Sequence, residues 1–334
     1  MAQILDSPTR AFRLSYAVNY SDKKVLVTGA YGFLGRAVVS ALEARNCREI
    51  VKIRKANVDL TRQEEVEKML ELHRPDLVFH LAGLVGGILV NKERPADFFL
   101  QNLLMGTFML HYSWKSGVDK FVAAGAGCGY PQFAPIPLKE TDFWAGLPQK
   151  ESAPYSLAKR LLTVQSESYE RQHGFHSIIC IPGNLYGPWD NFNLHDAHVV
   201  PALVRKFVEA EMQGLPEVEV WGTGKPTRDY VYSHDVAEGM LLAAEKYDKS
   251  ELVNISSGVE FSVSEVCEIL QDVTGFKGKV TWNTSKPEGQ ARRCFDLSKA
   301  RADLGYSPRT DLRTGIEKTV RWFKDNYHNP ELRK

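Results

Sequence analysis

The sequence has 334 residues, of which 43% are hydrophobic and 25% charged, and its formal net charge at pH 7 is +1. A chain of this length and composition can bury a substantial core, as one large or two moderate globular domains. The small net charge argues against bulk attraction to nucleic acid or to an anionic membrane. The five cysteines, at positions 47, 128, 180, 267 and 294, are odd in number and lack metal-ligand spacing. We therefore expect free thiols, no metal site and a cytoplasmic protein.

Residues 1–22 are polar and broken by Pro8, and we expect them to form an arm ahead of the globular part. This arm contains no hydrophobic segment of the signal-peptide type. No apolar run in the sequence reaches the length needed to span a membrane. We expect no interaction of the chain with a membrane.

Strand-like and helix-like segments alternate through the first half of the chain. Strands are expected at 24–27, 49–53, 77–80, 121–124 and 177–181, and helices at 33–45, 63–73, 96–116 and 155–173. The strands are apolar without alternation, which is typical of a parallel sheet covered on both faces. The sequence therefore predicts an α/β fold with a Rossmann-type, doubly wound parallel sheet.

The alternation loosens after Gly183. An aromatic loop is expected from residue 184, followed by helices at 200–212 and 236–246 and strands at 217–221 and 279–282. Segments 230–232 and 251–256 are expected to return to the main sheet as strands. We predict a sheet domain of residues 23–183 plus about 228–258, and a smaller, discontinuous α/β domain of residues 184–227 and 259–330.

Residues 25–35, Val-Leu-Val-Thr-Gly-Ala-Tyr-Gly-Phe-Leu-Gly, form an expected strand that runs into a glycine loop and opens a helix. The glycines allow a tight turn and a close approach to a pyrophosphate, whose charge lies at the helix N-terminus. A glycine-rich turn without a ligand is the alternative. Because the loop lies at the first strand–helix junction, it predicts dinucleotide binding by Gly29, Tyr31, Gly32, Phe33, Leu34 and Gly35.

The type of dinucleotide is indicated by the residues that follow the second strand. An acidic residue there would bind the ribose hydroxyls of NAD, whereas arginine suits the 2′-phosphate of NADP. The strand runs into Arg54 and Lys55, with no acid until Asp59. We therefore favour NADP over NAD. Asp59 and Leu60 lie where a carboxylate can meet the adenine amino group, and an N-cap role for Asp59 is an equal alternative.

Tyr155 and Lys159 stand four residues apart at the start of an expected helix. This spacing places both side chains on one face, where the ammonium favours the phenolate and suits the tyrosine to proton transfer. Tyr20 and Lys24 have the same spacing, so the pattern alone is not specific.

The glycine loop, the Tyr155–Lys159 pair and the stretch 227–235 together resemble the extended short-chain dehydrogenase/reductases. Six further stretches resemble the GDP-L-fucose synthase family, the bifunctional epimerase/reductases that act on a GDP-4-keto-6-deoxy-mannose: residues 85–88, 95–98, 128–131, 184–192, 198–203 and 285–289. The resemblance covers roughly residues 23–327, and these motifs occur in the order of the family.

The resemblance implies that Tyr155 protonates the C4 oxygen while NADPH delivers hydride to C4, and that Lys159 holds the nicotinamide ribose. Cys128 and His198 would act as base and acid on the carbons beside the 4-keto group, which are acidic because the ketone stabilises the enolate. A small buried hydrophobe is the alternative for Cys128, and a helix cap or core residue for His198. For the cofactor, the resemblance adds Leu81, Ala82, Gly83, Pro182, Asn184, Leu185 and His198.

A GDP-linked sugar needs cations for its diphosphate and planar partners for its base. Arg228 suits the diphosphate through bidentate contacts. The resemblance adds Ala126, Asn184, Lys206 and Trp221 as substrate contacts, with Arg205, Lys286 and Glu288 as weaker candidates. Solvated or packing side chains are the alternative for these basic and aromatic residues.

Two positions depart from the family pattern. Ala126 stands where the family carries a serine or threonine that donates to the C4 oxygen, and Gly183 replaces the usual threonine. Loss of one such donor costs on the order of 10²–10³ in rate in enzymes that depend on it. Three explanations of Ala126 stay open: an engineered substitution, a natural enzyme that emphasises epimerisation, and an enzyme that recruits water or another donor. The alternative functions are an epimerase that keeps its cofactor, like GDP-mannose 3,5-epimerase, a C4-reductase of a related GDP-deoxysugar or heptose, and a catalytically silent nucleotide-sugar-binding protein.

Helices 96–116 and 155–173 resemble those that form a four-helix dimer interface in this family. We expect a homodimer, with packing of both helices against the sheet as the alternative.

Overall fold

The main sheet has six parallel strands in the order β2-β1-β3-β4-β5-β9. The computed structural model describes residues 18–286 and 289–329. The strands are β1 (Lys24–Thr28), β2 (Glu49–Ile53), β3 (Leu77–His80), β4 (Lys120–Ala124), β5 (Ser177–Pro182) and β9 (Val253–Ile255). The strand order reverses between β1 and β3, and ligands of such sheets bind beyond the carboxyl ends of the strands at this point. The predicted α/β class and parallel sheet are confirmed.

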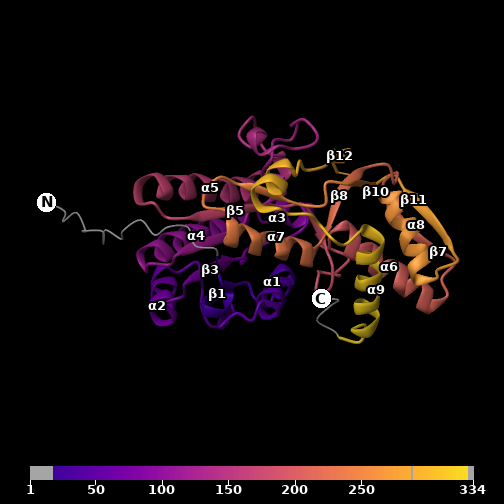
Figure 1. Cartoon of the computed structure of the whole chain (residues 1–334). Helices are drawn as coiled ribbons and strands as arrows, with labels where there is room; N and C mark the ends of the chain where they lie inside the picture. The colour runs from indigo at the N-terminus through magenta and orange to yellow at the C-terminus, as the bar shows by residue number, and fades with distance from the viewer. Residues whose placement is uncertain (1–17, 287–288, 330–334) are drawn as a thin grey trace.

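Two groups of helices pack around this sheet (Figure 1). α1 (Phe33–Ala44) packs beside α7 (Ser233–Lys246), whereas α4 (Pro95–Lys115) packs against both α2 (Gln63–His73) and α5 (Ala153–His173). The short α3 (Ile88–Glu93) precedes α4. The strands and the helices that face them build one continuous hydrophobic core.

A second hydrophobic core lies at the other end of the molecule from β1 and α2 (Figure 1). It is built by α6 (Val199–Gln213), α8 (Val263–Thr274), α9 (Leu312–Asp325), and the parallel pair β7 (Glu217–Trp221) and β11 (Lys279–Asn283). Phe192, Phe207 and Phe323 are completely buried in it. Chain segments that precede β9 in the sequence and segments that follow it therefore contribute to this second hydrophobic core.

The second sheet is organised around β8 (Thr227–Tyr232). This strand pairs in parallel with β6 (Asn184–Tyr186) and β12 (Arg292–Arg293), and antiparallel with β10 (Glu260–Ser262). The prediction that residues 230–232 return to the main sheet is wrong, because β9 occupies the edge of β5. The loop predicted from residue 184 begins instead as strand β6.

Gly183 is the single residue between β5 and β6. A Cβ atom at this position would collide with Ser256 Oγ. Its own N–H donates to the carbonyl of Ile255, the last residue of β9, at 3.1 Å. The glycine therefore lets the chain pass from the main sheet to the second sheet in close contact with the end of β9, which explains why a threonine does not fit here.

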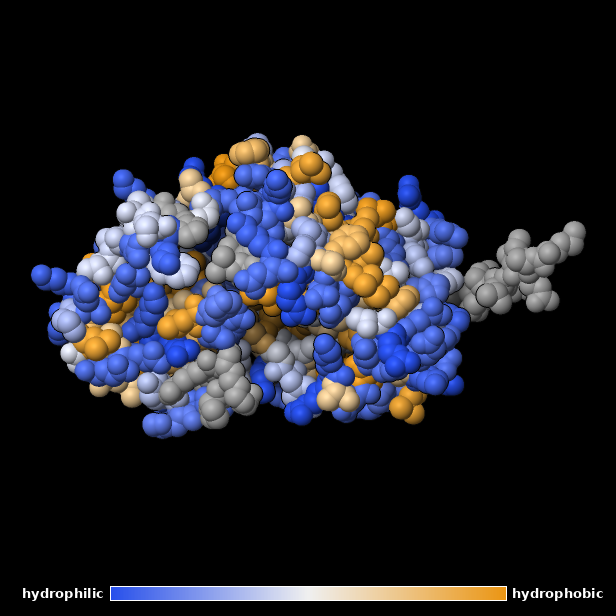
Figure 2. Space-filling view, turned by 180° about the vertical axis from the view of Figure 1, so that it is seen from behind, coloured by the Kyte–Doolittle hydropathy of each residue, from blue (hydrophilic) through white to orange (hydrophobic). Residues whose placement is uncertain are grey.

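Exposed apolar side chains are found on the outer sides of α4 and α5. Leu100 is 53% exposed, Leu161 43% and Val164 45%. Figure 2 shows apolar side chains interrupting the hydrophilic surface on the side of the molecule that carries these helices. In the described part of the chain, no helix is both long and apolar enough to cross a membrane.

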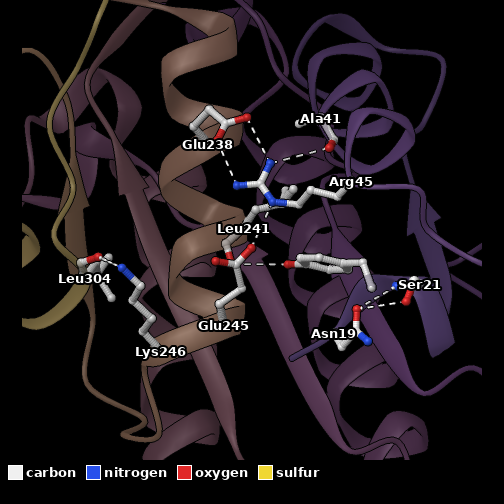
Figure 3. A network of polar contacts seen from close by, with 10 residues as sticks. Asn19, Ser21, Ala41, Arg45, Glu238, Leu241, Glu245, Lys246 and Leu304 are labelled. Carbon is white, nitrogen blue, oxygen red and sulfur yellow. Dashed lines mark hydrogen bonds and ion pairs between the residues drawn. The ribbon is translucent and has the colours of Figure 1, made fainter. Parts of the chain in front are cut away.

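The segment that precedes β1 is tied to α1 and α7 (Figure 3). Residues 18–22 of the expected arm are described, and Tyr20 in the 3-10 turn Tyr20–Asp22 is buried, with its hydroxyl donating to the carbonyl of Leu241 at 3.2 Å. Beside it, Arg45 donates to both oxygens of Glu238, at 3.0 and 2.8 Å, and to Glu245 at 2.9 Å. These contacts fix the end of α1 against α7.

Candidate active site

The glycine loop forms a close turn between β1 and α1. Gly29 has a φ of +67°, and a Cβ there would lie 2.8 Å from the Ala82 backbone nitrogen. A Cβ at Gly35 would collide with the carbonyl oxygen of Gly29. Gly32 is the N-cap of α1 and contributes no side-chain hydrogen bond. The first amides of α1 are therefore free of a side-chain cap, and the loop fits a pyrophosphate.

Thr28 and His80 join the glycine loop to the end of β3. Thr28 Oγ1 accepts from the N–H groups of Leu81 and Ala82, at 3.2 and 3.3 Å, and lies 2.8 Å from His80 Nδ1. Because the hydroxyl accepts twice, it donates its own hydrogen to Nδ1, so the imidazole carries its proton on Nε2. Burial lowers the His80 pKa to about 3, which keeps the ring neutral.

The basic residues after β2 lie near the glycine loop. The guanidinium of Arg54 lies 4.0 Å from the centre of the Tyr31 ring, and Lys55 is exposed. The alternative N-cap role for Asp59 is wrong, because Arg62 is the N-cap of α2. Asp59 instead accepts from the backbone N–H and the hydroxyl of Thr61, at 3.0 and 2.7 Å, in the turn that precedes this helix.

Tyr155 and Lys159 lie in the first two turns of α5, as predicted. Lys159 Nζ donates to the carbonyl of Ala124 at the end of β4, at 3.1 Å, and burial lowers its pKa to about 8. The Tyr155 ring packs edge-on against Phe98. The expected lowering of the Tyr155 pKa is not found: burial, followed by the charge of Cys128, raises it. The phenol is therefore a proton donor over the ordinary pH range.

Cys128 lies in the 3-10 turn Gly127–Gly129, just past β4. It is partly buried and belongs to no disulfide. Arg160 holds the turn by donating from Nε to the Gly129 carbonyl at 2.6 Å. Burial raises the pKa of the thiol, and the Ser156 hydroxyl lowers it.

His198 is the N-cap residue of α6, but its side chain makes no capping hydrogen bond. The alternative of a side-chain cap is therefore wrong. His198 is an exposed residue. Desolvation of its imidazole by the neighbouring protein lowers the pKa, and the Asp196 carboxylate opposes this shift by raising it.

The expected substrate ligands come from β6, β7, β8 and α6. Lys206 Nζ donates to the carbonyl of Glu219 at 2.8 Å and lies 5.8 Å from the centre of the Trp221 ring, so these two candidates are brought together. Asn184 donates from its side chain to the carbonyl of Asp229 at 3.2 Å.

The weaker candidates have different surroundings. Arg205 is engaged with the Glu209 carboxylate at 3.0 Å and the Phe192 carbonyl at 3.1 Å. Lys286 Nζ lies 5.3 Å from the centre of the Trp221 ring. Glu288 lies outside the described residues.

Arg228 is half-buried, and its Nη1 donates to the carbonyl of Thr227 at 2.7 Å. Among the residues that the structure describes, no carboxylate forms an ion pair with it, so its guanidinium can receive a diphosphate. Its neighbour in register on β12 is Arg293, which the motif analysis missed. Arg293 also lines a cavity of about 320 Å³ between β12 and residues 131–138. None of the four expected catalytic residues lines this cavity.

The sequence profile of the NAD-dependent epimerase/dehydratase family matches residues 25–256. The chain belongs to this family. Among curated relatives, GDP-L-fucose synthase of Sinorhizobium fredii is 39% identical, over 91% of this chain and 96% of the relative. GDP-L-fucose synthase 1 of Arabidopsis thaliana is also 39% identical, over 92% and 96%.

Two similar solved structures contain NADP. The GDP-L-fucose synthetase of Naegleria fowleri has a TM-score of 0.89 and 28% identity, with 97% of this chain and 99% of that chain covered. The GDP-mannoheptose C4 reductase MlghC of Campylobacter jejuni has a TM-score of 0.84 and 30% identity, with 91% and 99% covered. Solved proteins similar to this chain thus include a GDP-L-fucose synthetase and a GDP-mannoheptose C4 reductase.

Proposed function

We propose that this chain is an NADP-dependent epimerase/reductase of a GDP-linked 4-keto-6-deoxy sugar, with the activity of a GDP-L-fucose synthase. The observation that carries this proposal is the cluster of Tyr155, Lys159 and Cys128 past the end of β4. Lys159 Nζ donates to the carbonyl of Ala124, the last residue of β4, and the turn that bears Cys128 follows this strand. Tyr155 lies one turn before Lys159 on α5. The glycine loop, which fits the pyrophosphate of the cofactor, follows β1, which is separated from β4 in the sheet by β3.

In the epimerisation, Cys128 and His198 have the base and acid roles. The thiolate of Cys128 accepts a proton from a carbon next to the 4-keto group, and the electron pair moves to the C4 oxygen as an enolate. His198, as imidazolium, returns a proton to the opposite face of that carbon. Cys128 comes from the turn after β4 and His198 from the start of α6, and we propose that the sugar binds between them.

In the reduction, Tyr155 donates its proton to the C4 oxygen. When bound, NADPH supplies the hydride to C4. The raised pKa of Tyr155 suits this role, because the residue must hold its proton until the oxygen becomes basic. Lys159 orients the nicotinamide ribose and provides positive charge near the developing oxyanion. Ala126, which is buried beside this cluster, has no hydroxyl to add to Tyr155.

For the substrate, we propose that Arg228 binds the diphosphate and that Lys206, Trp221 and Asn184 make further contacts. We also propose a homodimer through α4 and α5, supported by the exposed Leu100 on α4. A cytoplasmic location agrees with five free cysteines.

Incubation with a GDP-4-keto-6-deoxy-mannose and NADPH tests the proposal. We expect NADPH consumption and, by NMR, a product with inverted carbons and a reduced C4. Tyr155→Phe should abolish NADPH consumption while solvent deuterium still enters the sugar. Absence of NADPH consumption by the wild type at high enzyme concentration would refute the reductase activity.

Ala126 favours one second candidate, an epimerase that keeps its cofactor. Deuterium incorporation without net NADPH oxidation would identify it. Ala126→Ser should then raise the reduction rate by up to roughly 10²–10³-fold, because it supplies the missing donor. Reduction at C4 without deuterium incorporation would instead identify a C4 reductase.

A further inference from the structure

Arg160 is a buried cation on α5, directly after Lys159. The residue is 3% exposed, and its Nε donates to the Gly129 carbonyl at 2.6 Å, while Nη1 donates to the Gly146 carbonyl at 2.9 Å. Nη2 is buried and has no hydrogen-bond partner in the part of the chain that the structure describes. Removal of a guanidinium from water is costly. Such an arrangement is expected where the bonded backbone must be held in place.

Arg160 and Lys159 bond the two ends of one backbone segment. Lys159 Nζ donates to the carbonyl of Ala124, where β4 ends, at 3.1 Å. Arg160 Nε donates to the carbonyl of Gly129, where the 3-10 turn ends. Cys128 lies on the segment between these two carbonyls. Because adjacent residues of one helix make both bonds, this segment is fixed to α5 at each end.

The 3-10 turn of this segment has weak local support. Gly129 N–H donates to the carbonyl of Ala126 at 2.9 Å, and this N-cap residue contributes no side-chain hydrogen bond. Tyr130 N–H donates to the carbonyl of Gly127 at 3.2 Å. The turn begins and ends with a glycine, so its backbone is intrinsically flexible. The bond from Arg160 restrains it from α5.

The second bond of Arg160 reaches a segment that packs on this turn. The guanidinium carbon lies 5.2 Å from the centres of both the Phe143 and the Trp144 ring, and Nη1 bonds Gly146. Phe143 in turn packs on Gly129, where a Cβ would lie 2.9 Å from Phe143 Cε2. The planar fork of arginine bonds both carbonyls at once, which a single ammonium does less well. Arg160 therefore joins the turn and the segment packed on it to α5.

We propose that Arg160 is a positioning residue that fixes Cys128 relative to Tyr155, so that the base of the epimerisation and the proton donor of the reduction act on one bound sugar. The inference rests on the proposed function for the use of these two groups. In the epimerisation the thiolate of Cys128 takes a proton from the sugar carbon and becomes a thiol, and the carbon's electron pair moves to the C4 oxygen. Tyr155 keeps its place on α5 without Arg160, so loss of Arg160 should slow this step more than the reduction.

Amide hydrogen exchange tests the restraint without substrate or turnover. It is followed by mass spectrometry in the peptide that contains residues 126–130. In Arg160→Met we expect the amides of Gly129 and Tyr130 to exchange about tenfold faster, because a hydrogen bond from a charged donor no longer opposes opening of the turn. Arg160→Lys keeps the charge without the fork, so its exchange rate should lie between those of the wild type and Arg160→Met.

Leu162→Ala is the matched control for lost stability. Leu162 is a buried residue of the same helix, and a Cβ at Gly106 of α4 would lie 3.4 Å from its Cδ1. The variant leaves a core cavity, and its exchange in residues 126–130 should equal that of the wild type. Thermal melting checks that each variant is folded. Unchanged exchange in Arg160→Met, or in Arg160→Lys where the former does not fold, overturns the inference, as does an equal increase in Leu162→Ala.

Two rates separate positioning from a general loss of activity. Solvent deuterium incorporation with NADP in place of NADPH measures epimerisation, and in Arg160→Met it should fall roughly 10–100-fold at an unchanged KM, the effect of a small misplacement of the base. NADPH oxidation with the epimerised sugar that Tyr155→Phe produces measures reduction, and its initial rate should stay close to that of the wild type.

The outcomes of these assays are distinct. Equal losses in both rates, or a raised KM alone, would overturn the role of Arg160 toward Cys128. If amide exchange depends on Arg160 but the wild type turns over no GDP-4-keto sugar, the proposed function fails while the restraint on the turn stands.

Discussion

Thr28→Val should weaken both the fold and cofactor binding, although the two side chains have nearly the same shape. The substitution removes the hydroxyl that serves His80 Nδ1 and the N–H groups of Leu81 and Ala82. Leu81 N–H keeps a second acceptor, the carbonyl of Thr28, at 3.3 Å. His80 Nδ1 and Ala82 N–H lose the partners that the structure shows for them.

The expected cost follows from these two orphaned groups. Thr28 is 0% exposed, so water cannot replace the hydroxyl. Each buried polar group left unsatisfied costs about 1–3 kcal/mol, so the two groups together cost about 1–5 kcal/mol once a gain of roughly 1 kcal/mol from the added methyl group is subtracted. At an unfolding entropy of about 2 cal/mol/K per residue, this lowers Tm by roughly 1–7 °C for a chain of 334 residues.

Thr28→Ser is the matched control, since it keeps the hydroxyl and loses one methyl group, at a cost of about 1 kcal/mol. Differential scanning fluorimetry measures Tm, and fluorescence titration measures NADPH binding. We expect weaker NADPH binding in Thr28→Val than in Thr28→Ser, because Ala82 N lies against the Gly29 turn. A valine variant as stable as the serine variant would refute the reasoning.

Three further predictions concern stability and pH. Arg45→Met should lower the free energy of unfolding by about 1–2 kcal/mol, since both partners are partly exposed. Because Arg45 lowers the Glu238 pKa, this difference should be present at neutral pH and vanish in urea titrations below about pH 4. The folded pKa of Lys159, about 8, is depressed, so its burial destabilises the fold at neutral pH, and this penalty should fade between pH 8 and 10.5. Lys159→Met should therefore raise Tm more at pH 7 than at pH 10, and equal shifts would contradict this. Gly183→Thr should cost about 1–3 kcal/mol through its clash with Ser256, and Ser256→Ala should restore part of the loss in thermal melts of the double variant.

Most of the main sheet could be predicted from the sequence, because its strands are apolar and alternate with helical segments across short turns. Strands 49–53 and 77–80 and helix 63–73 were predicted with their observed bounds. The pairing of β8 could not be predicted, because short apolar strands do not indicate which sheet edge is free. β6 and β12 have three and two residues and carry almost no periodicity.

The expected catalytic residues could be found because they stand in motifs with fixed spacing. Thr28 and His80 belong to strands that are otherwise apolar, so the sequence does not indicate that their side chains form a hydrogen bond across the sheet. Arg293 stands beside a second arginine, and only the pairing of β12 with β8 distinguishes the half-buried guanidinium from the exposed one. Sequence patterns show local spacing, whereas these contacts depend on the packing of distant segments.

The second core also constrains how the chain can fold during synthesis. Phe192 is buried against Phe323 of α9, at a ring-centroid distance of 4.7 Å, although most of the second half of the chain lies between them. On the ribosome, the strands up to β5 can assemble before α9, which packs against the aromatic segment around Phe192, has been synthesised. Until α9 emerges, this segment exposes apolar surface of the kind that chaperones bind.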